Sequence, residues 1–137
     1  MRTLCATAGE GRLAVTCQLT ETDGNGLTAF VFGGELPHVG GQALANPGPT
    51  LHGERLSRVD MWTAAVPGHK DAEAAAAVAR ELCLATGQPV SVVAGIHVDN
   101  ATAEEVRLLG SNALRAARAC VEGRAAKDVG KLERGLS

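Results

Sequence analysis

The sequence predicts a single-domain α+β sandwich, in which two main helices pack on one face of a mixed β-sheet. The 137 residues are enough for one hydrophobic core and too few for two. Residues 12–66 show strand-like patterns, whereas residues 71–123 show a helix, a strand and a second helix in that order. Strands followed by a β-α-β unit and a closing helix favour helices on one side of a sheet.

The first expected elements are two strands joined as a hairpin. Apolar residues alternate with small or polar ones over residues 13–19, which is the period of a half-buried strand. Residues 23–26 read Asp-Gly-Asn-Gly, a sequence that tolerates the positive φ angles of a tight turn. Residues 27–32 resume an apolar, β-prone run. A hairpin is therefore predicted over this part of the chain.

A third strand is expected from about Leu56 to Val66. Its alternation places Trp62 on the face opposite the apolar one. Between these strands lies the glycine- and proline-rich segment 33–53, in which the apolar residues 42–45 are a candidate for a further short strand. The conformation of the rest of that segment is left open.

An alanine-rich helix is expected to begin at Asp71, and Gly87 followed by Pro89 is a stop signal for it. Its apolar stripe comprises Ala75, Val78, Leu82 and Ala85. Residues 89–96 are rich in β-branched side chains and apolar on both faces, as expected of a central strand.

The second helix has a clear start signal, because Thr102 and Glu105 form a T-x-x-E capping box. Its apolar stripe comprises Val106, Leu109, Ala113, Ala116 and Cys120. We expect this helix to end at Gly123. The domain would then span residues 1–123, and residues 124–137 would form a flexible C-terminal tail.

Composition excludes several classes of function. The net charge is −2 without a basic run, and Phe30, Phe32 and Trp62 are the only aromatic residues, so nucleic-acid binding is not expected. No apolar stretch approaches the roughly 18–20 residues that span a bilayer. No secretory signal precedes residue 10, so a cytoplasmic location is expected.

Small side chains dominate the apolar positions, and this has two consequences. Alanine-faced helices bury little area per residue, so we expect a homo-oligomer to supply the missing burial. The four cysteines are widely spaced and contain no C-x-x-C motif, so they are interpreted as small buried hydrophobic residues.

The candidate chemistry lies in loops that contain histidine. His38 follows the glycine-rich turn, His69 precedes the first helix and His97 ends the last strand, whereas His52 has no distinctive neighbours and is interpreted as a surface residue. If the two strands that precede His69 and His97 are parallel, both side chains emerge at the same sheet edge. Helix N-termini follow both loops and Lys70 adds a positive charge, so a phosphate-bearing ligand is predicted.

The residues alone leave other interpretations open. Asp71, Asp99 and Asn100 are also typical of helix caps and turns. His38, His69 and His97, with or without Asp99, could hold a metal ion, either beside a bound cofactor or in a small metal-dependent enzyme. A scaffold protein whose glycine-rich segment is an interface loop is the third alternative.

Three segments carry a family resemblance: Gly34-Glu35-Leu36-Pro37-His38-Val39-Gly40 with the following Gln42-Ala43-Leu44-Ala45, then Pro67-Gly68-His69-Lys70-Asp71, and Gly95-Ile96-His97-Val98-Asp99-Asn100-Ala101-Thr102. Over about residues 9–121 the chain resembles the small accessory proteins of gallate-type decarboxylase operons, which are LpdD-like prenylated-flavin chaperones. The resemblance implies an accessory protein that binds prenylated FMN, or FMN, and helps to deliver it to, or mature it in, a UbiD-type (de)carboxylase.

The resemblance also suggests roles for individual residues. Gly68, His69 and Lys70 would hold the flavin phosphate, and His97, Asp99 and Asn100 would contact the ribityl chain or the ring edge. His38, Gly40 and Gly41 would close over the ring system. Trp62 is the one large side chain available for stacking, and a metal bound by His69 or His97 beside the flavin is left open.

Overall fold

The computed structural model describes residues 1–55 and 58–135. The strands of its main sheet are β1 (Arg2–Ala8), β2 (Val15–Glu21), β3 (Leu27–Gly34), β4 (Gly41–Pro47), β7 (Val59–Ala65) and β8 (Val90–His97). The remaining elements are the 3₁₀ turn η1 (Gly11–Leu13), the hairpin strands β5 (Thr50–Leu51) and β6 (Glu54–Arg55), and the helices α1 (Asp71–Thr86) and α2 (Ala103–Gly135).

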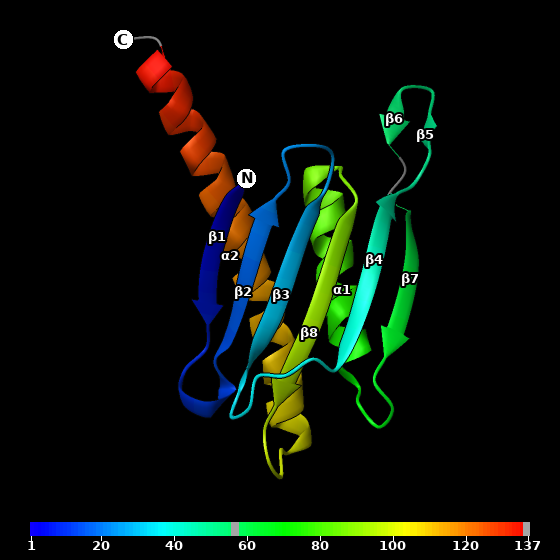
Figure 1. Cartoon of the computed structure of the whole chain (residues 1–137), viewed down its shortest axis with the longest axis vertical. Helices are drawn as coiled ribbons and strands as arrows, with labels where there is room; N and C mark the ends of the chain where they lie inside the picture. The colour runs from blue at the N-terminus through cyan, green and yellow to red at the C-terminus, as the bar shows by residue number, and fades with distance from the viewer. Residues whose placement is uncertain (56–57, 136–137) are drawn as a thin grey trace.

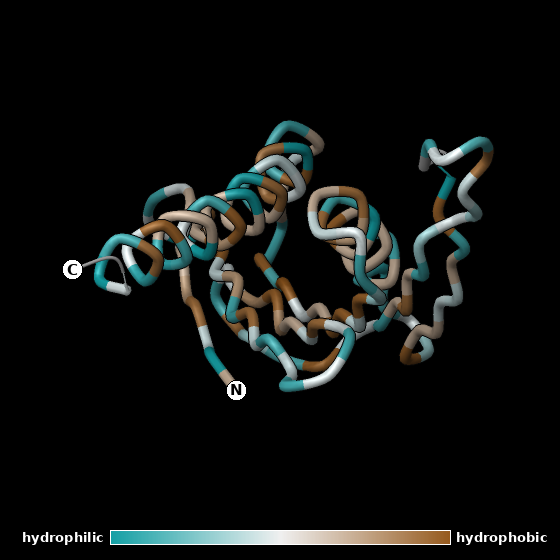
Figure 2. Tube along the Cα trace, turned by 90° about the horizontal axis from the view of Figure 1, so that it is seen from above, coloured by the Kyte–Doolittle hydropathy of each residue, from teal (hydrophilic) through white to brown (hydrophobic). Residues whose placement is uncertain are grey.

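The main sheet is mixed, with the order β1-β2-β3-β8-β4-β7. The neighbours β3 and β8 are parallel, and every other adjacent pair is antiparallel. Figures 1 and 2 show both helices on the same face of this sheet, so the opposite face is left without a covering layer. This two-layer arrangement confirms the predicted α+β fold.

The predicted hairpin between β2 and β3 is present, and its turn explains the glycine-rich sequence. Gly26 has a φ of 121°, and its carbonyl accepts hydrogen bonds from the backbone N–H and the hydroxyl of Thr22. The N–H of Gly26 donates to the side-chain oxygen of Gln88 at 3.0 Å. The turn is thus tied to the segment that leads into β8, which places β3 and β8 side by side.

The candidate strand at residues 42–45 proves to be part of β4, which lies between β7 and β8. Since β4 is antiparallel to both, β7 and β8 run in the same direction without being neighbours. Their carboxyl ends therefore lie at the same end of the sheet, which is the lower end in Figure 1. The loops that contain His69 and His97 both emerge there.

The core lies between the sheet and the two helices. On α1 its members are Ala75, Val78, Ala79, Leu82 and Cys83, all fully buried, and on the sheet they include Val15, Cys17, Leu19, Val31 and Val92. Gly87, with a φ of 68°, ends α1 as predicted, and its N–H donates to Cys83 O at 2.8 Å. Two predicted core positions are exposed instead, Ala85 at the end of α1 and Val106 near the start of α2.

The structure differs from the sequence analysis in two further respects. Residues 2–8 form the edge strand β1, which the sequence analysis missed. The second helix does not end at Gly123 but continues to Gly135. This continuation is held by Arg124, which forms an ion pair with Glu21. Residues 56–57, included in the third predicted strand, and residues 136–137 of the predicted tail lie outside the described residues.

The cysteines follow their prediction with one exception. Cys17, Cys83 and Cys120 are buried, whereas Cys5 is exposed, because it points to the uncovered face of the edge strand β1. All four are free thiols. Within residues 1–55 and 58–135, no helix combines the length and the apolar character needed to cross a bilayer.

Candidate functional site

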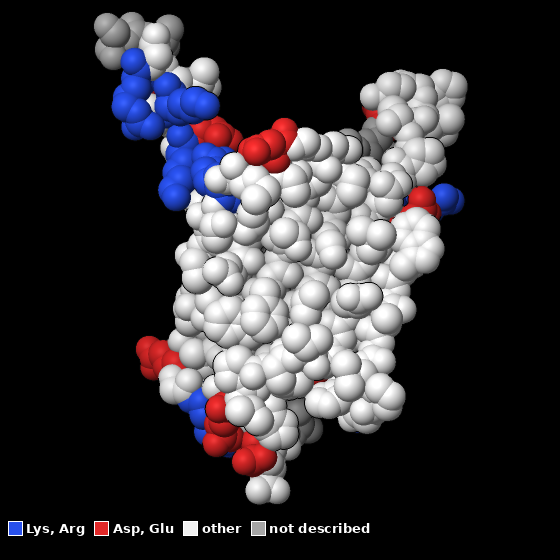
Figure 3. Space-filling model, in the orientation of Figure 1, with Lys and Arg blue, Asp and Glu red and all other residues white. Residues whose placement is uncertain are grey.

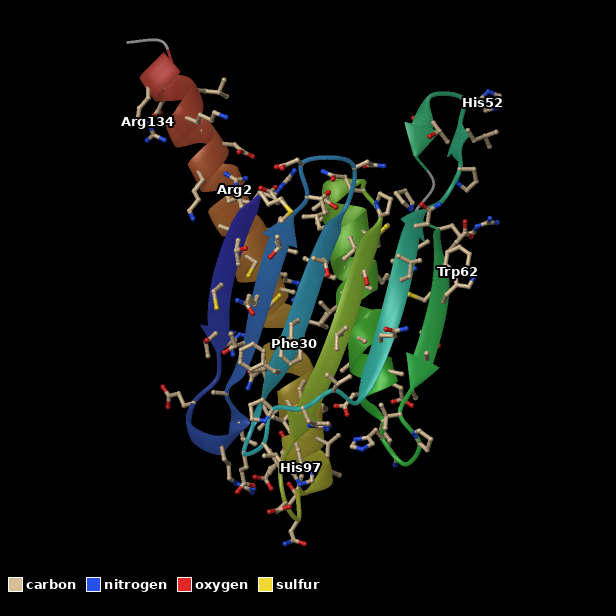
Figure 4. The ribbon with its side chains drawn as sticks, viewed as in Figure 1. Arg2, Phe30, His52, Trp62, His97 and Arg134 are labelled. Atoms are coloured by element: carbon tan, nitrogen blue, oxygen red, sulfur yellow. The ribbon has the colours of Figure 1, made fainter. Side chains whose placement is uncertain are left out.

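Three connecting segments meet at the carboxyl end of β8: residues 35–40 after β3, residues 66–70 before α1 and residues 98–102 before α2. Because β3 and β4 lie on either side of β8, the segment that joins them crosses the end of that strand. Figure 1 shows this crossing at the lower end of the sheet, and Figure 4 places His97 at the same end. The chain topology thus brings the three predicted histidine segments together.

A pocket of about 540 Å³ opens at this end, between the N-terminal halves of α1 and α2. Its polar side is formed by His38, Gly68, His69, Lys70, Asp71, Glu73 and His97. Its apolar wall is formed by Ala74, Ala77, Ile96, Val98, Ala101, Val106, Leu109, Gly110 and Leu114. A cleft of this size, with an apolar wall and a few convergent polar groups, is typical of a small-molecule site.

Three side chains at the pocket's edge converge closely. The Nε2 atom of His38 lies 2.9 Å from Oδ2 of Asp71 and 3.2 Å from Nδ1 of His69. The third separation, between His69 Nδ1 and Asp71 Oδ2, is 3.6 Å. Asp71 is 9% exposed, whereas His38 is half-buried and His69 exposed. We refer to these three residues as the His-His-Asp cluster.

Backbone groups fix two members of the cluster. The carbonyl oxygen of Leu36 lies 3.0 Å from His38 Nδ1, and since a carbonyl can only accept, Nδ1 carries the proton. The N–H of Ile96 donates to Asp71 Oδ1 at 2.9 Å. The imidazole of His38 and the carboxylate of Asp71 are therefore held in place by the loop before β4 and by the end of β8.

Glycines make this close approach possible. A Cβ at Gly40 would overlap the carboxylate of Asp71, and one at Gly41 would overlap the backbone of Ala72. A Cβ at Gly95 would overlap the carbonyl of His38, so only glycine lets the crossing segment lie directly on β8. Gly40 and Gly41 are both buried. Both glycines pack against the start of α1 and do not line the pocket.

The N-terminus of α1 is not capped by the side chain at its cap position. Lys70 occupies the cap position without a capping hydrogen bond from its side chain, and Asp71 turns its carboxylate toward β8 and His38. The first N–H groups of a helix have no partner within the helix and favour an anion. Among the described residues, the Lys70 ammonium forms no ion pair. An uncompensated positive charge thus lies at the pocket's rim beside a helix N-terminus.

His97 belongs to a second polar group beside the cluster. The centre of its ring lies 6.3 Å from that of His38, but its Nε2 contacts Asp99 Oδ1 at 2.7 Å. The N–H of Asp99 donates to Glu35 Oε1 at 3.0 Å, which ties the loop before α2 to the crossing segment. Asn100, with a φ of 53°, is exposed and does not line the pocket.

The predicted capping box closes this loop onto α2. The N–H of Thr102 donates to Glu105 Oε1, and the N–H of Glu105 donates to Thr102 Oγ1, both at 3.1 Å. The hydrogen bond to the backbone of Thr102, with the nearby Arg12, lowers the pKa of Glu105. The loop that presents His97 is therefore anchored at its helical end.

One predicted site residue, Trp62, lies elsewhere, as does His52, which was interpreted as a surface residue. Trp62 is 59% exposed on the uncovered face of the sheet, where it borders Leu44 and Ser91, and Figure 4 shows it far from His97. His52 lies in the turn between β5 and β6, at the other end of the molecule (Figure 4). Trp62 lines a different hollow from the histidines, so a flavin in the histidine pocket would lack this stacking partner.

Sequence reasoning interpreted Asp71 only as a cap and did not assign it to the site. A signal was available, because helix periodicity places Asp71 on the same face as the buried Ala75 and Val78, where a carboxylate requires partners. The apolar wall was not found, and Val106 was assigned to the core. It is 58% exposed and lines the pocket between the two helices.

Comparisons with known proteins show which family the chain belongs to. The model of the prenylated flavin chaperone LpdD-like domain matches residues 9–123. No curated protein matches the chain. Among solved structures, a chain from a novel chaperone complex for yeast 20S proteasome assembly is similar, with a TM-score of 0.50 and 14% identity over 91% of this chain and 95% of that chain. That likeness concerns the fold alone. The family match covers most of the chain and all three histidine segments, and the protein therefore belongs to the LpdD-like prenylated flavin chaperone family.

Proposed function

We propose that this protein binds prenylated FMN, or FMN, in the pocket between α1 and α2 and assists its delivery to, or maturation in, a UbiD-type (de)carboxylase. The observation that carries this proposal is the pocket itself, which combines an apolar wall with a cationic helix N-terminus. A flavin mononucleotide has the matching chemistry, because a flat and largely apolar ring system is joined through a polar chain to a phosphate.

The phosphate is assigned to the rim formed by Gly68, His69 and Lys70. Lys70 supplies a full positive charge, and the N-terminus of α1 adds N–H groups and the positive end of the helix dipole. Gly68 has a φ of 84° with open space around it, so the backbone there can approach a ligand closely. His97 is placed to contact the ribityl chain or the ring edge.

The ring system is assigned to the apolar wall. Val106, Leu109 and Leu114 offer aliphatic surface, and Ala74 and Ala77 leave room for a flat ligand to lie against α1. Of the residues that the structure describes, no phenylalanine or tryptophan lines the pocket, so binding of the ring would rest on burial of apolar area instead of stacking. Such a surface suits a carrier, which must release its cargo.

The experiment is to co-express the protein with a flavin prenyltransferase and identify the released small molecules by mass spectrometry. We expect the released material to contain prenylated FMN in an amount stoichiometric with the protein. In titrations with FMN and riboflavin, Lys70→Ala should weaken FMN binding several-fold and leave riboflavin binding unchanged, because only the phosphate contact is lost. Lys127→Ala, an exposed lysine far along α2, is the matched control. Protein without flavin, together with an inability to bind FMN, would contradict the proposal.

We also propose that the protein acts as a homo-oligomer in the cytoplasm. Four free thiols are typical of a reducing compartment. Figure 3 shows the uncovered sheet face almost without charge, whereas the charged side chains lie at the ends and edges of the molecule. Phe30, Leu44, Val93 and Trp62 border hollows on this face. Light scattering that finds a monomer at micromolar concentration would contradict the oligomer.

A further inference from the structure

We propose that the His-His-Asp cluster binds one divalent first-row transition-metal ion, with its remaining coordination positions open to the pocket. The ligand atoms are His38 Nε2, His69 Nδ1 and Asp71 Oδ2, which all lie within 4.8 Å of one another. This site rests on the arrangement of three side chains alone, and it does not depend on the assignment of a flavin to the pocket.

The first argument is that two imidazole nitrogens and a carboxylate oxygen converge on one point. Because Nδ1 of His38 donates to Leu36 O, the neutral ring presents its unprotonated Nε2 to the cluster. The carboxylate of Asp71, 2.9 Å away, is likewise an acceptor. Two acceptors at this separation require a cation between them, either a proton on His38 or a metal ion.

The second argument is geometric. The three atoms form a triangle with sides of 2.9, 3.2 and 3.6 Å. A tetrahedral ion with ligand bonds of about 2.0–2.1 Å separates its ligands by about 3.3 Å, so the observed triangle matches one face of such a site. A proton on His38 accounts for the 2.9 Å contact, whereas a single metal ion accounts for all three separations at once.

The third argument is that partners outside the cluster already orient two of the ligands. Metal-binding histidines usually donate their second ring N–H to a carbonyl or carboxylate, and ligating carboxylates are themselves hydrogen-bonded. His38 has Leu36 O, and Asp71 has the N–H of Ile96. Asp71 is also nine-tenths buried, which prevents water from replacing the partners of its carboxylate.

The donor set selects the class of ion. Two imidazoles and one carboxylate suit Zn²⁺, Fe²⁺ or Co²⁺, and they favour these ions over Ca²⁺ or Mg²⁺, which prefer oxygen ligands. Since all three residues line the pocket, the open positions face its interior. An oxygen atom of a bound ligand could therefore complete the coordination. His97 lies outside the cluster and contacts Asp99, so it is not assigned as a ligand.

The test uses flavin-free protein without a histidine tag, in a Cys5→Ser background that removes the exposed thiol. Binding of Zn²⁺ is measured by calorimetry, and Co²⁺ serves as a spectroscopic probe of nitrogen coordination. We expect one ion per chain. Loss of an outer partner typically weakens metal affinity by about 10- to 100-fold. Removal of a ligand in His69→Ala should therefore weaken it by about 100-fold or more.

His69→Ala is the decisive variant, because within residues 1–55 and 58–135 the polar contacts of this exposed side chain are with the cluster, and its loss should not affect folding. His97→Ala and His52→Ala are matched controls that should bind as the parent does. The proposal is overturned if His69→Ala keeps the parent affinity, or if His97→Ala loses as much. It is also overturned if neither Zn²⁺ nor Co²⁺ binds at millimolar concentration.

Discussion

The carboxylate of Asp71 accepts a hydrogen bond from the backbone N–H of Ile96 at 2.9 Å, which links the first turn of α1 to the end of β8. The same carboxylate contacts His38, so one buried side chain joins three segments of the chain. The contact between Asp71 and Ile96 stabilises the fold as well as the site. Without it, a backbone N–H at the end of the central strand loses its hydrogen-bond partner.

Asp71→Ala should therefore lower the free energy of unfolding by about 1–3 kcal/mol, the usual cost of a buried polar group without a partner. Urea denaturation measures this loss. Glu73→Ala, which removes an exposed carboxylate from the same helical turn, is the control and should cost much less. Equal losses in the two variants would assign the effect to helix electrostatics instead of the contact with Ile96.

Gly95→Ala should destabilise the protein and disturb the cluster together. The added methyl group would overlap the carbonyl of His38 and push the crossing segment away from β8. Overpacking of this kind costs about 1–3 kcal/mol. Thermal unfolding and the histidine ring signals in NMR spectra report the two effects. Gly24→Ala, which meets open space in a turn, should leave both measurements close to the wild type.

The thiols should differ sharply in reactivity. Cys5 is exposed, whereas the hydrogen bond with Cys120 and burial together raise the pKa of Cys17. Because the thiolate is the reactive form, we expect Cys5 alone to react with a thiol reagent in the folded protein, and all four cysteines to react after unfolding. Cys5→Ser should abolish the fast phase. A fast phase that persists in this variant would show that a buried thiol opens readily.

Stability should fall in acid partly through Glu21. Its hydrogen bond with Arg2, with Arg124 beside it, lowers the pKa of Glu21 in the folded state. The associated stability is complete above the unfolded value of about 4.3 and is lost as the pH falls through the lower folded value. Glu21→Gln should lower the free energy of unfolding by about 1 kcal/mol at pH 7. On acidification the variant should lose less stability than the wild type. Unfolding measured at pH 7 and pH 3 checks this sign, with Glu133→Gln as the control.

Residues 1–123 should fold without the rest of the chain. Beyond Gly123, α2 is mostly exposed, and the pair between Arg124 and Glu21 is one of its few links to the sheet. A chain truncated after Gly123 should keep the circular dichroism spectrum of a folded α+β protein. Its free energy of unfolding should fall by about 1 kcal/mol. The intact chain with Arg124→Ala should account for much of that cost. An unfolded truncated chain would contradict this prediction.

Local sequence patterns predicted the elements that have strong periodicity. Features that depend on contacts between distant parts of the chain were not predicted. The hairpin, α1, β8 and the Thr102–Glu105 capping box follow from neighbouring residues. The edge strand β1 was missed because its alternating residues are mostly small or polar. Gly123 was interpreted as a stop, yet it has no positive φ and the alanines after it continue the helix.

The site was predicted in part for the same reason. The loop positions of His69 and His97 predicted that both lie at one end of the sheet, whereas only the family resemblance placed His38 beside them. The position of β4 between β7 and β8 could not be read from the sequence, because it depends on which strands pair across 40 or more residues. That pairing brings His38 to Asp71 and separates His97 from them, so the membership of the cluster emerged only from the fold.

The segment that crosses the end of β8 also sets the order in which the protein can become functional. His38, Asp71 and Ile96 are brought together by the pairing of β3, β8 and β4, and their contacts join residues 25 and 33 positions apart. Contacts between distant residues form late and slowly, because loop closure must precede them. A nascent or partly folded chain would have no pocket, so the ability to hold a ligand here marks a chain that has finished folding.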